Sequence, residues 1–575
     1  MQLKQLKSCA AGLLFGMAAF ATPASLLAQN SLLIPGLIEG GPVTLDVQTG
    51  SHTFYEGIST DTYGANGPVL GPTVVLTQGE QADLTVINNL PDTTTMHWHG
   101  LHVASENDGG PFTAIAPGAS WNPVFEVMDE AGTYWYHPHL HHSTNFQVSM
   151  GISGMIWVRD AEELALDLPR TYGVDEFPII IQTKHFDEQS QIVSPSRADD
   201  VVMVNATLDA VLEVPAQVVR FHMLNASSER VFNLGLEGDE TFQMIATEGG
   251  LLEAPLELQR LRMAPGERSE WLLNLTGRAG DTLRLMSFAS EFAAGIYGAT
   301  NPGMMAGQTM TDYSPNALNG SDFTVLTLVV NAAGDAPVTA VPTVLDPGNA
   351  MPWTTDMADE ERTLTMAPTA MGFSALDGSF TINGLSFDHS VINYTIPLDN
   401  IEIWTITNNS PIGHPFHIHD VQFYILDRNG VPPVPEETGR KDVVFVPAMT
   451  SVRFMCAFED FANPDVPFMY HCHMLVHEDG GMMGSFVVVG PDAVADVAAP
   501  HLPFDVYPNP ASDHLNWNVP TGTQGQLEIH DAAGRRVMVR LATHGRLNIS
   551  SLPHGLYTAT WVGTQQTELR RFVVR

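Results

Sequence analysis

The chain has 575 residues, of which 44% are hydrophobic and 15% are charged. It is too long for one hydrophobic core, which predicts about three to four domains, and too apolar to be a disordered polymer. Its 64 acidic and 25 basic residues leave a formal net charge of −39, which disfavours nucleic acid and anionic membranes as partners and is typical of solubility outside the cell or of a surface that gathers cations.

The N-terminal segment, residues 1–28, is predicted to be a secretory signal peptide. Two lysines precede an apolar run from Ala10 to Phe20, and small residues up to Ala28 offer a cleavage site. The run is too short to hold the chain across a bilayer, so no integral membrane span is expected. Cleavage would leave two cysteines, of which Cys456 lies in a run typical of a buried strand.

Beyond the signal segment the chain consists of short β-type runs separated by Gly, Pro, Asn and Asp. Examples are residues 73–76, 82–87 and 484–489. Helical periodicity is confined to short stretches such as residues 160–168. This pattern predicts an all-β protein built from antiparallel β-sandwiches.

Four pairs of histidines, each pair separated by one residue, follow one another along the chain. They are His97 and His99, His137 and His139, His417 and His419, and His471 and His473. A single such pair is typical of a surface or structural pair, but four pairs together with His414, His477, Cys472 and Met482 indicate several metal ions. Imidazole suits copper and zinc, whereas a thiolate with a thioether selects copper.

Cys472 lies directly between His471 and His473. Successive side chains of an extended strand point to opposite faces, so the sulfur would face one way and both imidazoles the other. One short segment can therefore hold two different metal sites and connect them covalently. The set His414, Cys472, His477 and Met482 matches the ligands of a blue-copper electron-transfer centre.

These motifs resemble those of the multicopper oxidases, the family of laccases, bilirubin oxidases and bacterial copper-efflux oxidases. The resemblance covers residues from about 31 to 489 and is carried by HWHG at 97–100, HPH at 137–139, HPFHIH at 414–419 and HCHMLVHEDGGMM at 471–483. It implies three consecutive cupredoxin-like Greek-key β-sandwiches, at 31–160, 170–335 and 340–491. The middle one has no ligand motif and is expected to act as a spacer.

The resemblance also implies four copper ions per chain, held by these residues. The type 1 ion takes His414, Cys472 and His477, with Met482 as the axial ligand. The type 2 ion takes His97 and His417. One type 3 ion takes His99, His137 and His473, and the other takes His139, His419 and His471. A reductant would deliver electrons one at a time to the type 1 ion, Cys472 would pass them on, and dioxygen would be reduced to water at a trinuclear cluster between the first and third domains.

Two acids stand where the family places its proton-handling carboxylates. Asp108 follows His97 by eleven residues, and Glu478 directly follows His477. A carboxylate near a metal-bound water can orient it and relay a proton. On sequence alone each of these acids is typical of a solvated loop residue, and only the motif match favours a catalytic role.

The reductant is less well specified than the oxygen chemistry. Copper-efflux oxidases, whose reductant is Cu(I), carry an acid and a Met where this chain has Ser410 and Ile412. A laccase-like activity on phenols or aromatic amines is therefore preferred to oxidation of Cu(I), Fe(II) or Mn(II). A sparse methionine group is either ordinary packing or a site for Cu(I) or another metal ion; its members are Met351, Met357, Met366 and Met371.

Readings from other protein classes fit the motifs less well. A non-enzymatic copper-binding protein does not need eight histidines arranged for a cluster, a copper nitrite reductase lacks the full set of pairs, and a structural member of the fold should have lost ligands. The remaining histidines are expected to be structural or exposed; they include His102, His141, His142, His185 and His222.

A linker rich in Ala and Pro, residues 489–500, precedes a small module at 503–575. Turn signals between short runs predict a compact β-sandwich. The module resembles the C-terminal sorting domain of the type IX secretion system in YPNP at 507–510, D-x-x-G-R at 531–535 and L-x-x-G-x-Y at 552–557. This implies the secretion machinery as a partner and a secreted or cell-surface protein. An adhesion or carbohydrate-binding module is the alternative.

Overall fold

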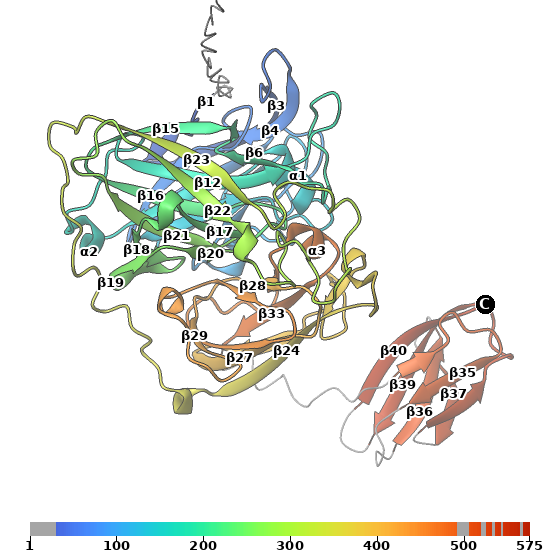
Figure 1. The fold of residues 1–575 in the computed structure, drawn as a ribbon. Helices are drawn as coiled ribbons and strands as arrows, with labels where there is room; N and C mark the ends of the chain where they lie inside the picture. Colours follow the sequence, from blue (N-terminus) through green and yellow to red (C-terminus); the bar gives the residue numbers. More distant parts are fainter. Residues whose placement is uncertain (1–29, 491–504, 519–524, 532–534, 542–543, 564–566) are drawn as a thin grey trace, which may run out of the picture. The chain divides into compact units, whose positions relative to one another are not determined.

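The computed structural model describes residues 30–490, 505–518, 525–531, 535–541, 544–563 and 567–575. The predicted signal peptide and most of the predicted linker lie outside these residues. The chain divides into two compact units, Met1–Gly490 and Pro491–Arg575, and each is described by itself. Strands dominate both units (Figure 1). Among the described residues, no helix has the length and apolar character needed to span a membrane.

The first sandwich places its two sheets around one apolar core. One sheet has the order β2 (Leu37–Glu39), β5 (Thr73–Thr77), β11 (Gly154–Arg159), β10 (Gly132–His137) and β7 (His97–His99). The other has the order β4 (Thr60–Ala65), β3 (Val43–His52), β6 (Gln81–Asn88) and β8 (Ser120–Trp121), with β9 (Val124–Glu126) also paired to β6. In β6 alternate residues are buried, because one face covers the core and the other meets solvent.

The second sandwich contains larger sheets and a separate core. One sheet has the order β1 (Asn30–Ser31), β15 (Ala210–Pro215), β23 (Asp322–Asn331), β22 (Thr282–Phe288), β17 (Phe232–Leu236) and β20 (Leu261–Met263). The other has the order β14 (Thr207–Leu208), β13 (Val201–Val204), β12 (Glu176–Lys184), β16 (Val218–Asn225), β21 (Arg268–Asn274), β18 (Phe242–Thr247) and β19 (Gly250–Leu258). The strand β1, which precedes the first sandwich in sequence, thus pairs with the second.

The third sandwich again has two sheets with a common core. One has the order β25 (Phe380–Ile382), β24 (Glu360–Pro368), β27 (Asn400–Asn408), β31 (Ser451–Phe458) and β29 (Tyr424–Arg428). The other has the order β26 (Tyr394–Pro397), β33 (Met483–Val489), β32 (Phe468–Cys472), β28 (His414–Ile418) and β30 (Val443–Val446). Cys456 is buried in β31, as predicted.

The sheets are mixed rather than purely antiparallel, which corrects the sequence-based expectation. The pairs β3 with β6, β5 with β11, β12 with β16, β24 with β27 and β26 with β33 are parallel. Side-chain alternation indicates a strand but not its direction, because direction depends on whether the connection is a hairpin or a longer crossover.

Helices in the described residues are short and lie between strands. The α-helices are α1 (Thr144–Met150), α2 (Ala161–Leu164) and α3 (Leu475–Asp479), and α2 falls in the stretch where helical periodicity was predicted. The 3-10 helices are η1 (Ser105–Asn107), η2 (Glu237–Asp239), η3 (Ala289–Glu291), η4 (Thr355–Met357), η5 (Ala375–Asp377) and η6 (Pro435–Glu437). The carboxylate of Asp479, at the end of α3, accepts from the backbone N–H groups of Thr144 and Asn145 at the start of α1.

The C-terminal unit is a small β-sandwich, as the sequence predicted. One sheet has the order β34 (Asp505–Tyr507), β35 (His514–Asn518) and β38 (His544–Asn548). The other has the order β37 (Arg536–Leu541), β36 (Gly525–Asp531), β39 (Gly555–Gly563) and β40 (Thr567–Val574). Trp517, Trp561 and Phe572 are among the large side chains that fill its core.

Candidate metal centres

Neighbouring strands bring the histidine motifs together in pairs. In the first sandwich β7 and β10 are antiparallel, with His97 opposite His137. In the third sandwich β28 and β32 are antiparallel, with His417 opposite His471 and Phe416 opposite Cys472. Register therefore aligns motifs that are far apart in the sequence.

Eight histidines from these two sandwiches converge on one buried centre, in which each side chain is at most 1% exposed. Nδ1 of His99 lies 3.4 Å from Nε2 of His137 and 3.2 Å from Nε2 of His473. Nε2 of His471 lies 3.0 Å from Nε2 of His139 and 3.3 Å from Nε2 of His419. In each predicted type 3 triad, one imidazole nitrogen thus lies within 3.4 Å of a nitrogen of each of the other two rings.

His97 and His417, the predicted type 2 pair, each use one ring nitrogen to bind the backbone. Nδ1 of His97 donates to the carbonyl oxygen of Asp108 at 2.8 Å, and Nδ1 of His417 donates to that of Asp442 at 2.8 Å. Because a carbonyl can only accept, Nε2 of each ring carries the free lone pair. Both Nε2 atoms are buried without a hydrogen-bond partner among the described residues. A metal ion would supply the missing partner.

The soft donor set forms a second buried site within the third sandwich. Sγ of Cys472 lies 3.5 Å from Nδ1 of His414 and 3.7 Å from Nδ1 of His477, and these two nitrogens are 3.2 Å apart. The backbone of Met482 bonds to both Cys472 and His477, and its side chain is fully buried in the same core cluster. The predicted type 1 residues are therefore neighbours in space.

Ser410 orients His414, a contact that the sequence did not reveal. The Ser410 hydroxyl donates to the carbonyl oxygen of Ile412 and lies 2.7 Å from Nε2 of His414. Nε2 then donates to the hydroxyl, which leaves the Nδ1 lone pair facing the Cys472 sulfur.

Burial keeps the donor atoms in the states that metal ions need. Loss of solvent lowers the pKa of His414 and of His471 to about 3, so both imidazoles are neutral at neutral pH. Burial also raises the pKa of the Cys472 thiol. A metal ion at this site must therefore displace the thiol proton, and binding releases a proton.

The two predicted carboxylates are buried against the histidine cluster. Asp108 Oδ2 lies 2.8 Å from Nδ1 of His419, and Oδ1 lies 3.3 Å from Nδ1 of His97. Glu478 places its oxygens 3.3 Å from Nδ1 of His139 and 3.4 Å from Nδ1 of His471. Burial, followed by the charge of Asp479, holds the pKa of Glu478 well above its usual range. Neither acid is a solvated loop residue.

Asp442 and Arg268 complete the centre and had no motif to mark them. Asp442 Oδ1 lies 3.1 Å from Nε2 of His99, and both its carboxylate oxygens accept from Arg268 at 2.6 Å. Arg268 begins β21, in the second sandwich. The second sandwich, which the sequence led us to expect as a spacer, therefore also contributes a side chain that binds the group contacting His99 and His417.

The other histidines lie outside both sites. His102 pairs with Asp420, His185 pairs with Asp200, and His222 bridges Glu176 and Thr133. His141 stacks on His142. None of them joins the groups of converging metal-binding side chains among the described residues, which agrees with the structural or exposed roles predicted for them.

The sandwiches and these two donor sets define a class: multidomain cupredoxin-like metalloproteins with a thiolate site linked to a histidine cluster. Family models described as multicopper oxidase match residues 46–163 and 354–492, and a model described as secretion system C-terminal sorting domain matches residues 505–575. The chain belongs to the multicopper oxidase family, is an oxidoreductase, and carries a sorting domain at its C-terminal end.

Relatives in sequence carry two different names. The multicopper oxidase mco of Staphylococcus aureus is 32% identical over 454 residues, covering 77% of this chain and 88% of that protein. The cell division protein FtsP of Escherichia coli strain K12 is 30% identical over 470 residues, covering 80% and 93%. Membership of the family therefore includes relatives that are named for a process other than oxidation.

Solved structures agree with this assignment. A laccase-like multicopper oxidase, CueO, from Ochrobactrum sp., with activity towards lignin model compounds and lignosulfonate, is 31% identical with a TM-score of 0.69, covering 80% of this chain and all of that one. A multicopper oxidase from Campylobacter jejuni, described as a metallo-oxidase, is 26% identical with a TM-score of 0.66, covering 80% and 96%.

Proposed function

We propose that this protein couples one-electron oxidation of a phenol or aromatic amine at a type 1 copper to four-electron reduction of dioxygen to water at a trinuclear copper cluster. The observation that carries the proposal is the segment His471-Cys472-His473. Cys472 belongs to the soft donor set, while His471 and His473 each belong to one triad of the histidine cluster. Electrons can therefore pass between the sites through a few covalent bonds.

Both donor sets fit copper. The soft set offers two imidazoles and one thiol, with a thioether nearby, and the cluster offers eight buried imidazoles, of which His97 and His417 each have an Nε2 atom without a hydrogen-bond partner among the described residues. When bound, copper would supply one-electron redox chemistry, and the four ions of the two sites together could store the four electrons that dioxygen needs. His97 and His417 would hold the type 2 ion. The two triads, one containing His99 and the other His139, would each hold one type 3 ion. The type 1 ion would be held by His414, Cys472, His477 and Met482.

The chain's own acids provide for the protons. Asp108 and Glu478 contact different imidazoles of the cluster: Asp108 contacts His97 and His419, and Glu478 contacts His139 and His471. Burial raises the pKa of Glu478, which favours the acid form that can donate a proton, and Asp108 can orient a water and accept from it. These assignments make Cys472, Asp108 and Glu478 the catalytic residues.

A cavity beside the soft site is the place where a reductant can dock. It has a volume of about 330 Å³ and is lined by His477 and Phe380, together with the charged residues Arg197, Asp312 and Asp377. The rings of Phe380 and His477 lie 4.3 Å apart between centroids. An aromatic donor would stack there against a ligand of the type 1 copper, and a carboxylate would accept the proton that a phenol loses on oxidation.

Oxidation of a metal ion is the second candidate, because an exposed methionine contacts the segment before His414 and other methionines are exposed. Met304 donates its backbone N–H to Pro411, three residues before His414, and its side chain is 48% exposed. Met305, Met371 and Met449 are also exposed, whereas Met366 of the predicted methionine group is buried in the core. Thioethers bind Cu(I) well, and the similarity to a metallo-oxidase supports this candidate.

A role outside oxidation is the alternative from another class, since FtsP relatives bear the name of a cell division protein. The chain retains every predicted ligand, and the histidines and Cys472 converge on the two sites, which favours redox chemistry. Copper loading separates the two, because a purely structural protein gains no oxygen consumption from it.

We infer from the sorting domain that the enzyme is exported by a type IX route. The signal segment would direct the chain out of the cytoplasm, and the C-terminal unit would engage the secretion machinery. The oxidase would then be released or attached at the cell surface with the unit removed.

The proposal is tested by a reductant panel on copper-loaded protein. Oxygen uptake is compared with a phenol, an aromatic amine, Cu(I), Fe(II) and Mn(II), in the wild type and in Asp377→Asn. The laccase-like assignment predicts the highest kcat/KM with the organic donors and a raised KM for them in the variant. A strong preference for Cu(I) would replace it with the second candidate.

A further inference from the structure

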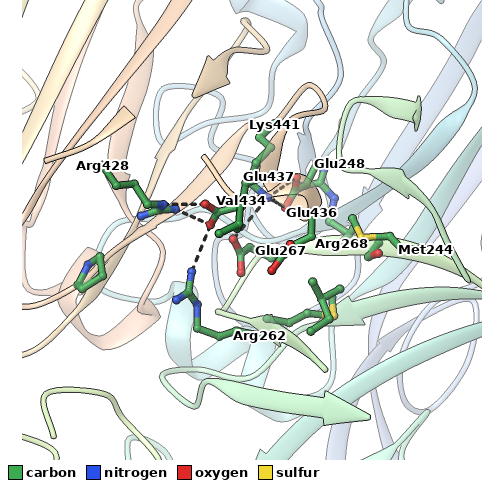
Figure 2. Close-up of a pocket in the computed structure, with 14 residues that line it drawn as sticks. Met244, Glu248, Arg262, Glu267, Arg268, Arg428, Val434, Glu436, Glu437 and Lys441 are labelled. Atoms are coloured by element: carbon green, nitrogen blue, oxygen red, sulfur yellow. Dashed lines mark hydrogen bonds and ion pairs between the residues drawn. The ribbon is translucent and has the colours of Figure 1, made fainter. Parts of the chain in front are cut away.

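A charged cavity separates the second and third sandwiches next to the histidine cluster. It has a volume of about 270 Å³, and its charged lining comes from both sandwiches (Figure 2). Its side chains form two ion-pair groups. The inner group joins Lys441 to Glu248 and Glu267, and the outer group joins Glu437 to Arg428 and Arg262.

The inner group is buried, and it crosses between the sandwiches. Lys441 Nζ donates to both oxygens of Glu248, at 2.8 and 2.7 Å, and lies 3.5 Å from Glu267. Lys441 and Glu267 are each 5% exposed, and Glu248 is fully buried. Replacing such a group with apolar side chains is often neutral or stabilising. Stability alone is therefore a weak explanation for its presence here.

The neighbours of Lys441 tie it to the cluster. Asp442 follows it directly, binds Arg268 through both carboxylate oxygens, and contacts His99 with its side chain and His417 with its backbone carbonyl. Arg440 precedes it, and the Arg440 carbonyl accepts from Gly249 N–H at 3.0 Å and from the Thr247 hydroxyl at 2.7 Å. Each of the three consecutive residues 440–442 is therefore hydrogen-bonded to the second sandwich.

We propose that the inner group, Lys441 with Glu248 and Glu267, is a positioning device for the type 2 copper site. By fixing Lys441 to the second sandwich it sets where Asp442 lies, and Asp442 in turn fixes the rings of His99 and His417. This inference rests on the proposed function, because it assumes that the cluster holds copper. Contacts of this kind typically change metal affinity or activity by about 10–100-fold when removed.

The outer group of the same cavity provides a matched control. Arg428 is a cation paired with Glu437, and it bonds to the carbonyl oxygen of Phe445 rather than to the segment at 440–442. Lys441→Met and Arg428→Met each remove one cation from the cavity. Only Lys441→Met removes a contact from the residue that directly precedes Asp442.

The test measures copper content, the type 2 signal in electron paramagnetic resonance, and the blue absorbance of full-length protein, with Lys441→Arg as the conservative variant and Glu248→Gln as the milder one. We expect Lys441→Met to keep the blue absorbance, to lose most of the type 2 signal and to lower kcat about 10–100-fold. Lys441→Arg should recover much of the signal, and Glu248→Gln should lose part of it. Arg428→Met should keep it.

Two results would overturn the proposal, and they are distinguishable. If Lys441→Met and Glu248→Gln keep the wild-type type 2 signal and turnover while their melting temperatures fall, the group only docks the sandwiches. If Lys441→Met fails to fold, an unchanged signal in Glu248→Gln is enough to reject the proposal. A wild-type protein that binds copper without any type 2 signal would instead refute the proposed function, and this inference with it.

Discussion

Asp108 contacts two imidazoles that are expected to bind different ions. Its carboxylate reaches His97 and His419, and its own carbonyl accepts from His97. It is 2% exposed, so bulk water does not compete for its oxygens. A residue in this position can orient a water at the cluster. It does not take part in the soft site, which contains Cys472.

Asp108→Asn is predicted to separate colour from turnover. The amide keeps the size of the side chain but cannot accept a proton, so we expect normal type 1 absorbance with most oxygen consumption lost. Glu106→Gln is the control, because Glu106 is an exposed acid in the same loop and bonds to Asn463. Unchanged oxygen uptake in Asp108→Asn would remove this residue from the mechanism.

At this scale the sequence predicted the candidate ligands but not the groups that orient them. The ligands stand in short motifs, and the structure brings all of these motifs together. Arg268 and Asp442 are 174 positions apart in the sequence, so no local spacing relates them. The sequence marks Ser410 only as a difference from copper-efflux oxidases. Its hydrogen bond to His414 could not be predicted, because it depends on the turn at residues 410–412.

At the scale of elements, a tight turn of the second sandwich limits the space around a predicted ligand. The turn joins β20 to β21 and is closed by hydrogen bonds from Gly266 N–H to Asn225 and from Ala264 N–H to the Glu267 carboxylate. Gly266 has φ +84°, and a Cβ there would lie 2.8 Å from Cγ of His473. Both the backbone conformation and the close approach require glycine.

Gly266→Ala is therefore predicted to displace His473 and to lower the occupancy of its type 3 site. We expect a reduced near-ultraviolet band and slower turnover, with the blue absorbance retained. Gly277→Ala is the control, since Gly277 also has positive φ, +79°, but has open space where its Cβ would be. Equal losses in the two variants would mean that backbone strain, and not the ligand contact, causes the effect.

Strands with one buried face could be predicted from the alternation of polar and apolar residues. For strands buried on both faces, the positions of buried charged residues could not be predicted. In β6 the polar residues at 81, 83 and 85 are at least partly exposed, and the apolar residues at 82, 84 and 86 between them are buried. In β12 every residue is buried, including Glu176 and Lys184 at its ends. Such a central strand carries charge because partners in other strands neutralise it, as Arg159 and Arg220 do for Glu176, and those partners are known only from the fold.

At the scale of the whole molecule, the oxidase and the sorting unit have separate cores. The first unit contains all the predicted copper ligands, and the second has its own core around Trp517 and Trp561. Compact units of this kind fold and act independently when few contacts join them. Catalysis and export are therefore expected to be separable.

A chain that ends at Gly490 is predicted to keep kcat and KM within about twofold of the full-length protein and to lose export beyond the outer membrane. Activity is measured on purified protein, and export is measured by comparing the culture medium and cell surface with the periplasm. Loss of copper from the shortened chain would contradict the separation, and normal export would remove the sorting role.

The copper content of the wild-type protein, measured together with its spectra, tests the central claim most directly. The account predicts about four copper ions per chain, a blue type 1 band, a type 2 signal in electron paramagnetic resonance and a type 3 band in the near-ultraviolet. About one copper ion per chain without the near-ultraviolet band would contradict it, because the eight-histidine centre would then not be a trinuclear cluster.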